Sequence, residues 1–165
     1  MKIYFAGPWF TAAQEEREER LKAKLRSLGF EVHSPKEESN ITGSFADSDV
    51  RKATFDSNIE NIDKCDILFA VCDGKQGICT EPDKNGQPFA GIDAGTMIES
   101  GYAYNSRKRT GSPIIVYYSE TLGDKPFNLM LAQSADIVIT NYDELDNLPK
   151  WIEENIKVNY NGKIE

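Results

Sequence analysis

The residues best suited to chemistry lie between positions 91 and 103, where the sequence reads Gly-Ile-Asp-Ala-Gly-Thr-Met-Ile-Glu-Ser-Gly-Tyr-Ala. This segment predicts the start of a helix, with Asp93 near its N-cap and Glu99 about two turns inside. The neighbours of Glu99 on its helix face, at positions 95, 96, 102 and 103, are small or aromatic. A carboxylate on such a surface needs a partner or a chemical role. Glu99 is therefore the first candidate for catalysis, whereas Asp93 taken alone is best explained as a helix cap.

A second candidate region is the turn after the first predicted strand, Tyr-Phe-Ala-Gly-Pro-Trp-Phe at positions 4–10. Gly7 permits a sharp turn. Two adjacent aromatic residues on a tight turn cannot both point inward. Of Trp9 and Phe10 we therefore expect one in the core and the other as a flat wall for a planar ring. The chain contains neither GxGxxG nor GxxxxGK[ST], so a neutral ligand with a planar part is favoured over a nucleotide with several phosphates.

Two asparagines are weaker candidates. Asn128 follows Lys-Pro-Phe and precedes Leu-Met, a context that suits either a helix N-cap or an amide offered to a ligand. Asn58 lies on a predicted helix together with Asp56 and Glu60, and a solvated face explains most of that charge. The residue types alone leave both interpretations open for Asn128 and give Asn58 no special role.

The elements that must position these residues follow from the hydrophobic pattern. Short apolar runs predict strands at residues 3–6, 30–35, 66–72, 113–118 and 136–140. Between and after them, helices are predicted at 12–28, 50–64, 94–104 and 128–132, with a last helical stretch over 142–156 interrupted around Pro149. Residues 36–49 are expected to form a mobile loop. Residues 75–91, with three glycines and two prolines, predict a long loop of functional type that could act as a lid.

This alternation predicts an α/β fold. We expect a single domain over residues 1–165, built as a flavodoxin-like, doubly wound, five-stranded parallel sheet with helices on both faces. Such sheets bind ligands at the carboxyl ends of their strands. That rule directs attention to the turn at residues 7–10, the region 73–95 and the region 124–130.

The overall composition limits the partners. Of 165 residues 39% are hydrophobic, enough for one good core without disulfides or metal. Lys and Arg number 19 against 27 Asp and Glu, and the formal charge of -8 argues against nucleic acid or an anionic membrane surface as partner. No apolar run approaches the ~20 residues of a membrane span, and a Gly-Pro break at positions 7 and 8 comes too early for a signal peptide. We therefore expect a cytoplasmic protein.

The cysteines and the single histidine give no sign of a metal site. Cys65, Cys72 and Cys79 form no CxxC pair, and His33 is the one histidine of the chain. These are too few soft ligands for structural zinc. We expect reduced, mostly buried thiols and no metal or cofactor.

Three blocks together resemble the nucleoside 2-deoxyribosyltransferases. They are an initial Ile-Tyr-Phe-Ala-Gly-Pro-Trp-Phe, a middle Asp-Ala-Gly-Thr-Met-Ile-Glu-Ser-Gly-Tyr-Ala and a late Phe-Asn-Leu-Met. The blocks appear in the family's order, and the resemblance covers nearly the whole chain. It implies a flavodoxin-like fold and exchange of the base of 2'-deoxyribonucleosides for a free purine or pyrimidine base. The exchange would proceed with retention through a covalent deoxyribosyl-enzyme intermediate.

The resemblance also implies roles for individual residues. Glu99 matches the family's nucleophile, Tyr4 the tyrosine that orients it, and Asp93 a carboxylate that binds sugar hydroxyls. Asn128 matches an amide that family members insert into a neighbouring subunit's site, which implies a homo-oligomer. Asn58 stands where some members have an Asp, and an amide cannot serve as that general acid.

From this match we expect Asn58 to recognise the base and the proton for the leaving base to come from water or from another acid such as Asp56 or Asp73. The last residue of the family's chains reaches the base, and here it is Glu165 in place of the aromatic residue of the lactobacillus enzymes. The block that contains Gly7, Trp9 and Phe10 is expected to line the substrate site.

Two other functions remain open. A nucleoside 5'-monophosphate N-glycosidase of the same superfamily uses a similar Glu but closes on a phosphate. Such enzymes tend to have a Ser- and Arg-rich turn after the first strand, where this chain has Pro-Trp-Phe. A non-catalytic nucleoside or nucleotide sensor could keep the pocket without needing Glu99 to react. The transferase is favoured over both because all three sequence blocks match it.

Overall fold

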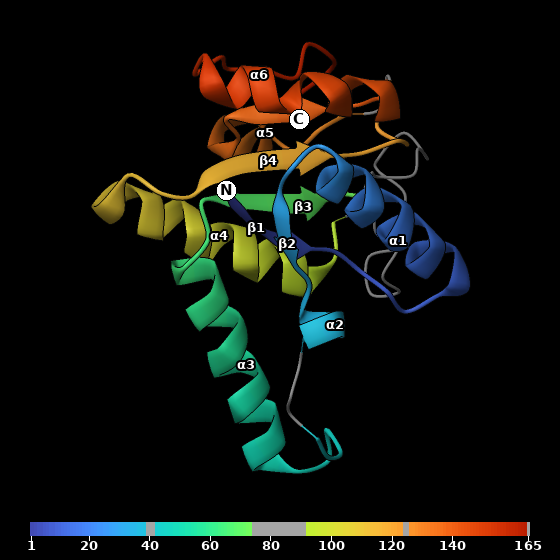
Figure 1. Cartoon of the computed structure of the whole chain (residues 1–165), viewed down its shortest axis with the longest axis vertical. Coiled ribbons are helices and arrows are strands. Elements are labelled where there is room, and N and C mark those ends of the chain that lie inside the picture. The colour runs from blue at the N-terminus through green and yellow to red at the C-terminus, as the bar shows by residue number, and fades with distance from the viewer. Residues whose placement is uncertain (39–41, 74–91, 124–125, 165) are drawn as a thin grey trace.

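Five parallel strands lie at the centre of the structure in the order β2-β1-β3-β4-β5 (Figure 1). They are β1 (Lys2–Ala6), β2 (Glu31–His33), β3 (Ile67–Val71), β4 (Ile114–Tyr118) and β5 (Ile137–Ile139). This confirms the predicted flavodoxin-like order. The order changes direction between β1 and β3, and a doubly wound sheet has its ligand crevice at the carboxyl ends of such a pair.

This structure is a computed structural model that describes residues 1–38, 42–73, 92–123 and 126–164. The loop predicted over residues 75–91 lies outside the described residues, and so do Cys79 and Glu165. Among the helices of the described part, none is long and apolar enough to cross a membrane.

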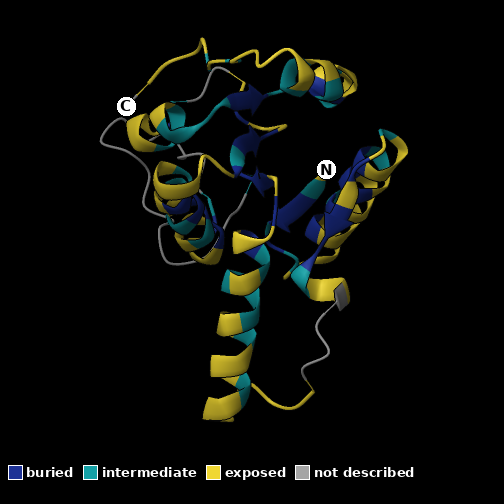
Figure 2. Cartoon of the chain, turned by 60° about the vertical axis from the view of Figure 1, so that its left-hand side comes forward, coloured by how far each residue is buried: buried dark blue, intermediate teal, exposed yellow. Residues whose placement is uncertain are grey.

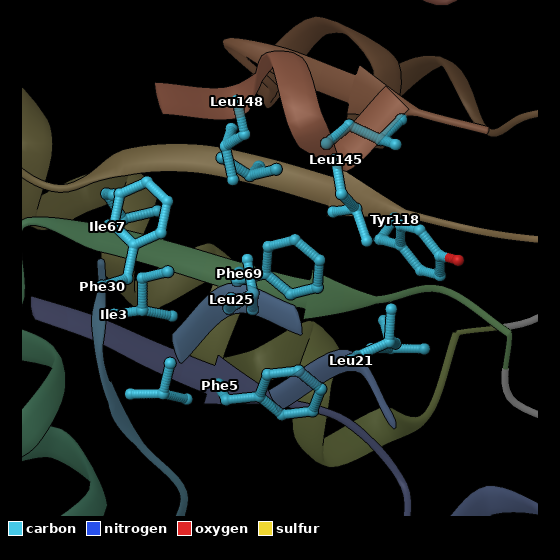
Figure 3. Close-up of a cluster of buried hydrophobic side chains, with 14 of the residues drawn as sticks. Ile3, Phe5, Leu21, Leu25, Phe30, Ile67, Phe69, Tyr118, Leu145 and Leu148 are labelled. Atoms are coloured by element: carbon cyan, nitrogen blue, oxygen red, sulfur yellow. The ribbon is translucent and has the colours of Figure 1, made fainter. Parts of the chain in front are cut away.

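Helices cover both faces of the sheet. On one face, α1 (Ala12–Ser27), the 3-10 helix η1 (Tyr142–Asn147) and α6 (Leu148–Glu153) pack against the strands. Figure 3 shows this core, in which Leu21, Leu25, Leu145 and Leu148 approach the aromatic ring of Phe69 and its neighbours. On the other face lie α3 (Ser48–Asp63), α4 (Ala94–Thr110) and α5 (Leu129–Ser134). We call this second side the Tyr4 face, because Tyr4 belongs to its core.

The burial of β3 shows that this strand lies at the centre of the fold. All five of its residues, Ile-Leu-Phe-Ala-Val, are buried, because alternate side chains enter the two cores and helices cover both. Figure 2 shows the same result for the sheet as a whole, with buried strands between exposed outer helix surfaces. Cys65 and Cys72 are buried free thiols of the Tyr4 face, as predicted.

Several predicted boundaries are wrong. The helix expected over 94–104 runs to Thr110. The short helix α2 (Pro35–Glu38) takes the end of the strand expected over 30–35 and the start of the loop expected over 36–49, and α3 begins within that loop at Ser48. The helix α2 is attached to α1 through Glu37, which bonds to Lys22 at 2.7 Å and to Arg26. These cations lower the pKa of Glu37 to about 2, with Arg26 making the larger contribution.

The helix α3 extends away from the body of the molecule, as Figures 1 and 2 show. Of its sixteen residues only Ile62, near its carboxyl end, is buried. There it is fastened to α4, where the Tyr102 hydroxyl donates to the Asp63 carboxylate at 2.9 Å. A helix with so little packing within its own chain leaves most of one face available to another surface.

Candidate active site

A hydrogen bond between β1 and α4 forms the centre of the candidate site. The hydroxyl of Tyr4 donates to Glu99 Oε1 at 2.6 Å. Tyr4 is fully buried in the middle of β1, opposite Leu68 of β3, so its ring lies under the helices of the Tyr4 face. Glu99 lies between the buried residues Thr96 and Ala103 on the side of α4 that packs on the sheet. Glu99 therefore lies on the face of α4 that is turned to the sheet.

Burial sets the protonation of this pair. Loss of solvent is the largest influence and raises the pKa of Glu99, the Tyr4 hydrogen bond lowers it, and the nearby negative charge of Asp93 raises it. Together these effects bring the pKa of Glu99 to about 7. Burial, with the Glu99 carboxylate as the second cause, raises the pKa of Tyr4 above its ordinary value, so the phenol keeps its proton and remains a donor. At neutral pH the Glu99 carboxyl therefore exchanges between its acid and its carboxylate.

Asp93 is the N-cap of α4, as its position in the sequence predicts. Its Oδ2 accepts hydrogen bonds from the backbone N–H of Thr96 at 3.1 Å and from the Thr96 hydroxyl at 3.4 Å, and the residue is buried. Gly95 permits this arrangement, because a Cβ at that position would lie 3.0 Å from Asp93 Oδ2. The cap keeps a second carboxylate close to Glu99, where a role in binding sugar hydroxyls stays a prediction.

The aromatic turn differs in part from the prediction. Trp9 and Phe10 stack on each other, with ring centroids 5.8 Å apart and 23° between their planes. Neither enters the core: Trp9 is half-buried and Phe10 is 62% exposed, so the expectation that one of them is a core residue is wrong. They form a flat apolar surface at the carboxyl end of β1. Gly7 packs closely on β3, because a Cβ there would lie 3.2 Å from Val71 Cβ.

The two asparagines lie on other elements than the nucleophile candidate, Asn128 at the start of α5 and Asn58 on α3. Asn128 is exposed and caps α5, accepting from the backbone N–H of Met130 at 2.9 Å and of Leu131 at 3.4 Å. Asn58 is half-buried on α3. Within the described residues, no hydrogen bond joins either asparagine to Glu99. A ligand role for these two side chains stays a prediction.

Asp73, one of the acids considered for the leaving base, is engaged by groups that follow β4. Its carboxylate is nearly buried and accepts from the hydroxyls of Ser119 and Thr121 and from the backbone N–H groups of Glu120 and Thr121. Arg17 approaches the same carboxylate at 3.8 Å. These contacts join the carboxyl ends of β3 and β4.

Asp56, the other acid considered for that proton, forms an ion pair with Lys52 one turn earlier on α3, and more than half of its side chain is exposed. Within the described residues, Asp56 makes no hydrogen bond to Tyr4 or Glu99.

His33 lies at the site, although the sequence indicated no role for it there and it was considered only as a metal ligand. His33 ends β2, lies opposite Tyr4 in the parallel register and stacks on its ring, with centroids 5.7 Å apart. The signal available in the sequence was its place at the end of the strand that neighbours β1 in the flavodoxin-like order.

The arrangement supports nucleophilic or acid–base chemistry at Glu99. One carboxylate oxygen is held by a neutral phenol, the pKa is near neutrality, and part of the side chain remains exposed. A carboxylate with these properties can attack an electrophilic carbon, or it can transfer a proton.

Comparison with known proteins identifies a family for the chain. The family model for nucleoside 2-deoxyribosyltransferases matches residues 3–148. A solved 2-deoxyribosyltransferase from Bacillus psychrosaccharolyticus has a TM-score of 0.74 and 24% identity, with 97% of this chain and 99% of that chain covered. A conserved protein from Enterococcus faecalis V583 has a TM-score of 0.51 and 25% identity, covering 100% of this chain and 90% of its own.

A CMP N-glycosidase from Clostridium botulinum has a TM-score of 0.50 and 16% identity, covering 94% of this chain and 100% of its own. No curated protein matches the chain significantly. The likenesses below 25% identity establish the shared fold, while the family model covers most of the chain, from β1 to the start of α6, and includes both Tyr4 and Glu99. The chain therefore belongs to the nucleoside 2-deoxyribosyltransferase family.

Proposed function

We propose that the protein exchanges the base of 2'-deoxyribonucleosides for a free purine or pyrimidine base through a covalent intermediate on Glu99. The observation that carries this proposal is the 2.6 Å hydrogen bond from the buried Tyr4 hydroxyl to Glu99 Oε1. It leaves Oε2 as the attacking atom and fixes the carboxylate plane. The nucleophile is the deprotonated form, so activity requires a pH near or above the raised pKa of Glu99, about 7.

The reaction has two displacements at C1' of the deoxyribose. In the first, Glu99 Oε2 forms a bond to C1' while the bond from C1' to the base nitrogen breaks, and the departing base takes a proton from water. In the second, a nitrogen of the incoming base bonds to C1', the ester bond breaks, and that base loses a proton while Glu99 recovers its carboxylate. Two inversions give retention of configuration. A 2-deoxy sugar lacks the electron-withdrawing 2'-hydroxyl, so its oxocarbenium-like transition state needs modest electrostatic help.

We assign the proton of the departing base to water, because the carboxylates of Asp73 and Asp56 are already engaged by other groups of the chain. Asp73 is held by hydroxyl and backbone donors between β3 and β4, and Asp56 is exposed and paired with Lys52. Asn58 then recognises the base through its amide, which can donate and accept but cannot supply a proton. The stacked Trp9 and Phe10 supply an apolar surface for the planar base.

The described part of the carboxyl-terminal tail, up to Ile164, runs beside β5 and Phe127. Val158 bridges to Ile137 of β5, and the bridge from Ile164 to Phe127 brings the tail beside the residue that precedes Asn128. The Phe127 N–H donates to the Lys163 carbonyl at 2.9 Å. We propose that Glu165 contacts the base, as the resemblance to the family implies.

The same proposal includes assembly with a second copy of the chain. Among the described residues, the large exposed hydrophobic side chains on helices all lie on the Tyr4 face, on α3, α4 and α5: Phe55, Met97, Ile98, Leu129 and Met130. On α1, η1 and α6 no large hydrophobic residue is exposed. Such an asymmetric apolar surface is typical of an interface between chains. Leu129 and Met130 directly follow the exposed Asn128, so this interface would carry its amide toward the neighbouring site.

Light scattering and exchange activity test the assembly together. We expect the Met130→Lys variant to dissociate and to lose activity, because a charge replaces a 75% exposed apolar side chain in the interface. Gln133→Lys, on an exposed position of the same helix, is the matched control and stays associated. A fully active monomer would contradict the shared site.

The function is tested by incubating the protein with deoxyinosine and adenine and separating the products by chromatography. The transferase yields deoxyadenosine and hypoxanthine, and Glu99→Ala lowers that rate at least about a thousandfold. Glu16→Ala, on the exposed side of α1, is the matched control and keeps the rate. Free deoxyribose without exchange would indicate a hydrolase. Cleavage of CMP or dCMP in its place would support the nucleotide N-glycosidase, and no reaction with either substrate would support a sensor.

A further inference from the structure

We propose that His33 is a positioning residue, which acts by holding the Tyr4 ring in the plane that directs its hydroxyl to Glu99. This inference rests on the proposed function and adds a residue to its catalytic machinery. It gives the single histidine of the chain a role at the carboxyl end of β2.

The register of the sheet brings the two rings together. Tyr4 of β1 and His33 of β2 are directly opposite in the parallel ladder, so their side chains leave the sheet on the same face. The ring centroids are 5.7 Å apart and the planes differ by 29°, an offset stack. Both residues are buried, His33 with 6% of its surface exposed, so solvent does not compete for this contact.

The position of the Tyr4 ring matters because its hydroxyl is the atom of the side chain farthest from the backbone. Rotation about the Cα–Cβ or Cβ–Cγ bond moves the oxygen far more than it moves the ring carbons next to the backbone. The bond to Glu99 is 2.6 Å long and weakens steeply when its angle departs from linearity. A flat ring against the Tyr4 ring restricts these rotations, which an aliphatic side chain of similar volume does less well.

The lateral packing of β2 shows why the restraint must come from His33. On the other side of β1 lies β3, where the residue opposite Tyr4 is Leu68, which has an aliphatic side chain. The strand β2 is at the edge of the sheet and only three residues long, so its last residue covers the Tyr4 ring at the open side. His33 therefore completes the enclosure of the residue that orients the nucleophile.

A double-mutant cycle tests the inference, with His33→Leu, His33→Phe, Tyr4→Phe and the double variant His33→Leu/Tyr4→Phe. We expect His33→Leu to lower kcat for exchange about fivefold to tenfold with little change in KM, and His33→Phe, which keeps a flat ring, to stay within about twofold of the original rate. In the Tyr4→Phe background the hydroxyl is absent, so His33→Leu should lower kcat no further. Equal losses in both backgrounds would show that His33 acts independently of Tyr4 and would overturn the proposal.

A second measurement separates this inference from the proposed function, because it needs no activity. The titration of Glu99 is followed by NMR in protein with labelled glutamate carboxyl carbons. Tyr4 and Asp93 are the groups that act on Glu99 in the described part of the chain. Since the Tyr4 hydrogen bond lowers the pKa of Glu99, His33→Leu should raise that pKa when Tyr4 is present and leave it unchanged in Tyr4→Phe. An unchanged titration in both backgrounds would contradict the positioning role even if exchange activity is found, whereas absence of exchange in the unmodified protein would refute the function alone.

Discussion

The substitution Glu99→Gln should stabilise the protein, and more so as the pH rises. Burial raises the pKa of Glu99 from 4.5 to about 7 in the folded chain, whereas the unfolded chain ionises near the ordinary value. Between these values unfolding releases a proton, so the stability of the original protein falls as pH rises through this range. At about 1.4 kcal/mol per pKa unit, the full difference is about 3 kcal/mol above pH 7. Gln is neutral at every pH and keeps an oxygen that accepts from Tyr4.

Urea unfolding at pH 5 and pH 8.5 measures this effect. We expect Glu99→Gln to exceed the original protein by less than about 1 kcal/mol in free energy of unfolding at pH 5 and by about 3 kcal/mol at pH 8.5. Glu16→Gln, on the exposed side of α1, is the control and should show no such pH-dependent gain. Equal pH dependence in Glu99→Gln and the original protein would refute the reasoning, because it would mean that folding does not disfavour the charge on Glu99.

Three further predictions concern the residues around this carboxylate. Tyr4→Phe removes the donor that lowers the pKa of Glu99. The apparent pKa on the acid side of the plot of kcat/KM against pH should therefore rise above its original value near 7. An unchanged apparent pKa would exclude Tyr4 as the partner of the reacting group. Asp73→Ala leaves hydroxyl and backbone donors without their acceptor, and urea unfolding should show a loss of about 2–4 kcal/mol; a loss below about 1 kcal/mol would mean that water replaces the carboxylate. Gly95→Ala favours the helix by up to about 1 kcal/mol, but its Cβ displaces Asp93. Steady-state kinetics should therefore give a higher KM for the nucleoside in a protein of equal or higher stability. An unchanged KM would show that Asp93 does not bind the substrate.

The central part of the fold could be predicted from the sequence because its signals are local. A continuous apolar run predicts the strand Ile67–Val71, and an N-cap residue predicts the helix that begins at Ala94. Each of these signals spans only a few residues of the chain. Glu99 could be singled out in the same way, because its neighbours on the helix surface lack charge. The pairing of Glu99 with Tyr4 came only from the resemblance to the family, since 95 positions separate the two residues.

The features that the sequence did not indicate depend on partners far along the chain. The end of α4 was placed too early because residues 105–109 have no apolar face; the helix continues because Ser106 contacts Asp63 and Arg107 pairs with Asp136. Asp73 was considered an acid because its donors, at positions 119–121, follow a different strand. Such polar contacts follow from the three-dimensional arrangement of the strands and leave no periodic pattern in the sequence.

The most direct test of the account is the site of covalent attachment. A nucleoside with fluorine at C2' forms the sugar ester but loses it slowly, because fluorine withdraws electrons from the oxocarbenium-like transition state. Protein incubated with this analogue is digested and analysed by tandem mass spectrometry. We predict one added fluorinated sugar on the peptide that contains Glu99, localised to that side chain. An adduct on another residue, or turnover of deoxyribonucleosides by Glu99→Ala at the original rate, would contradict the central claim.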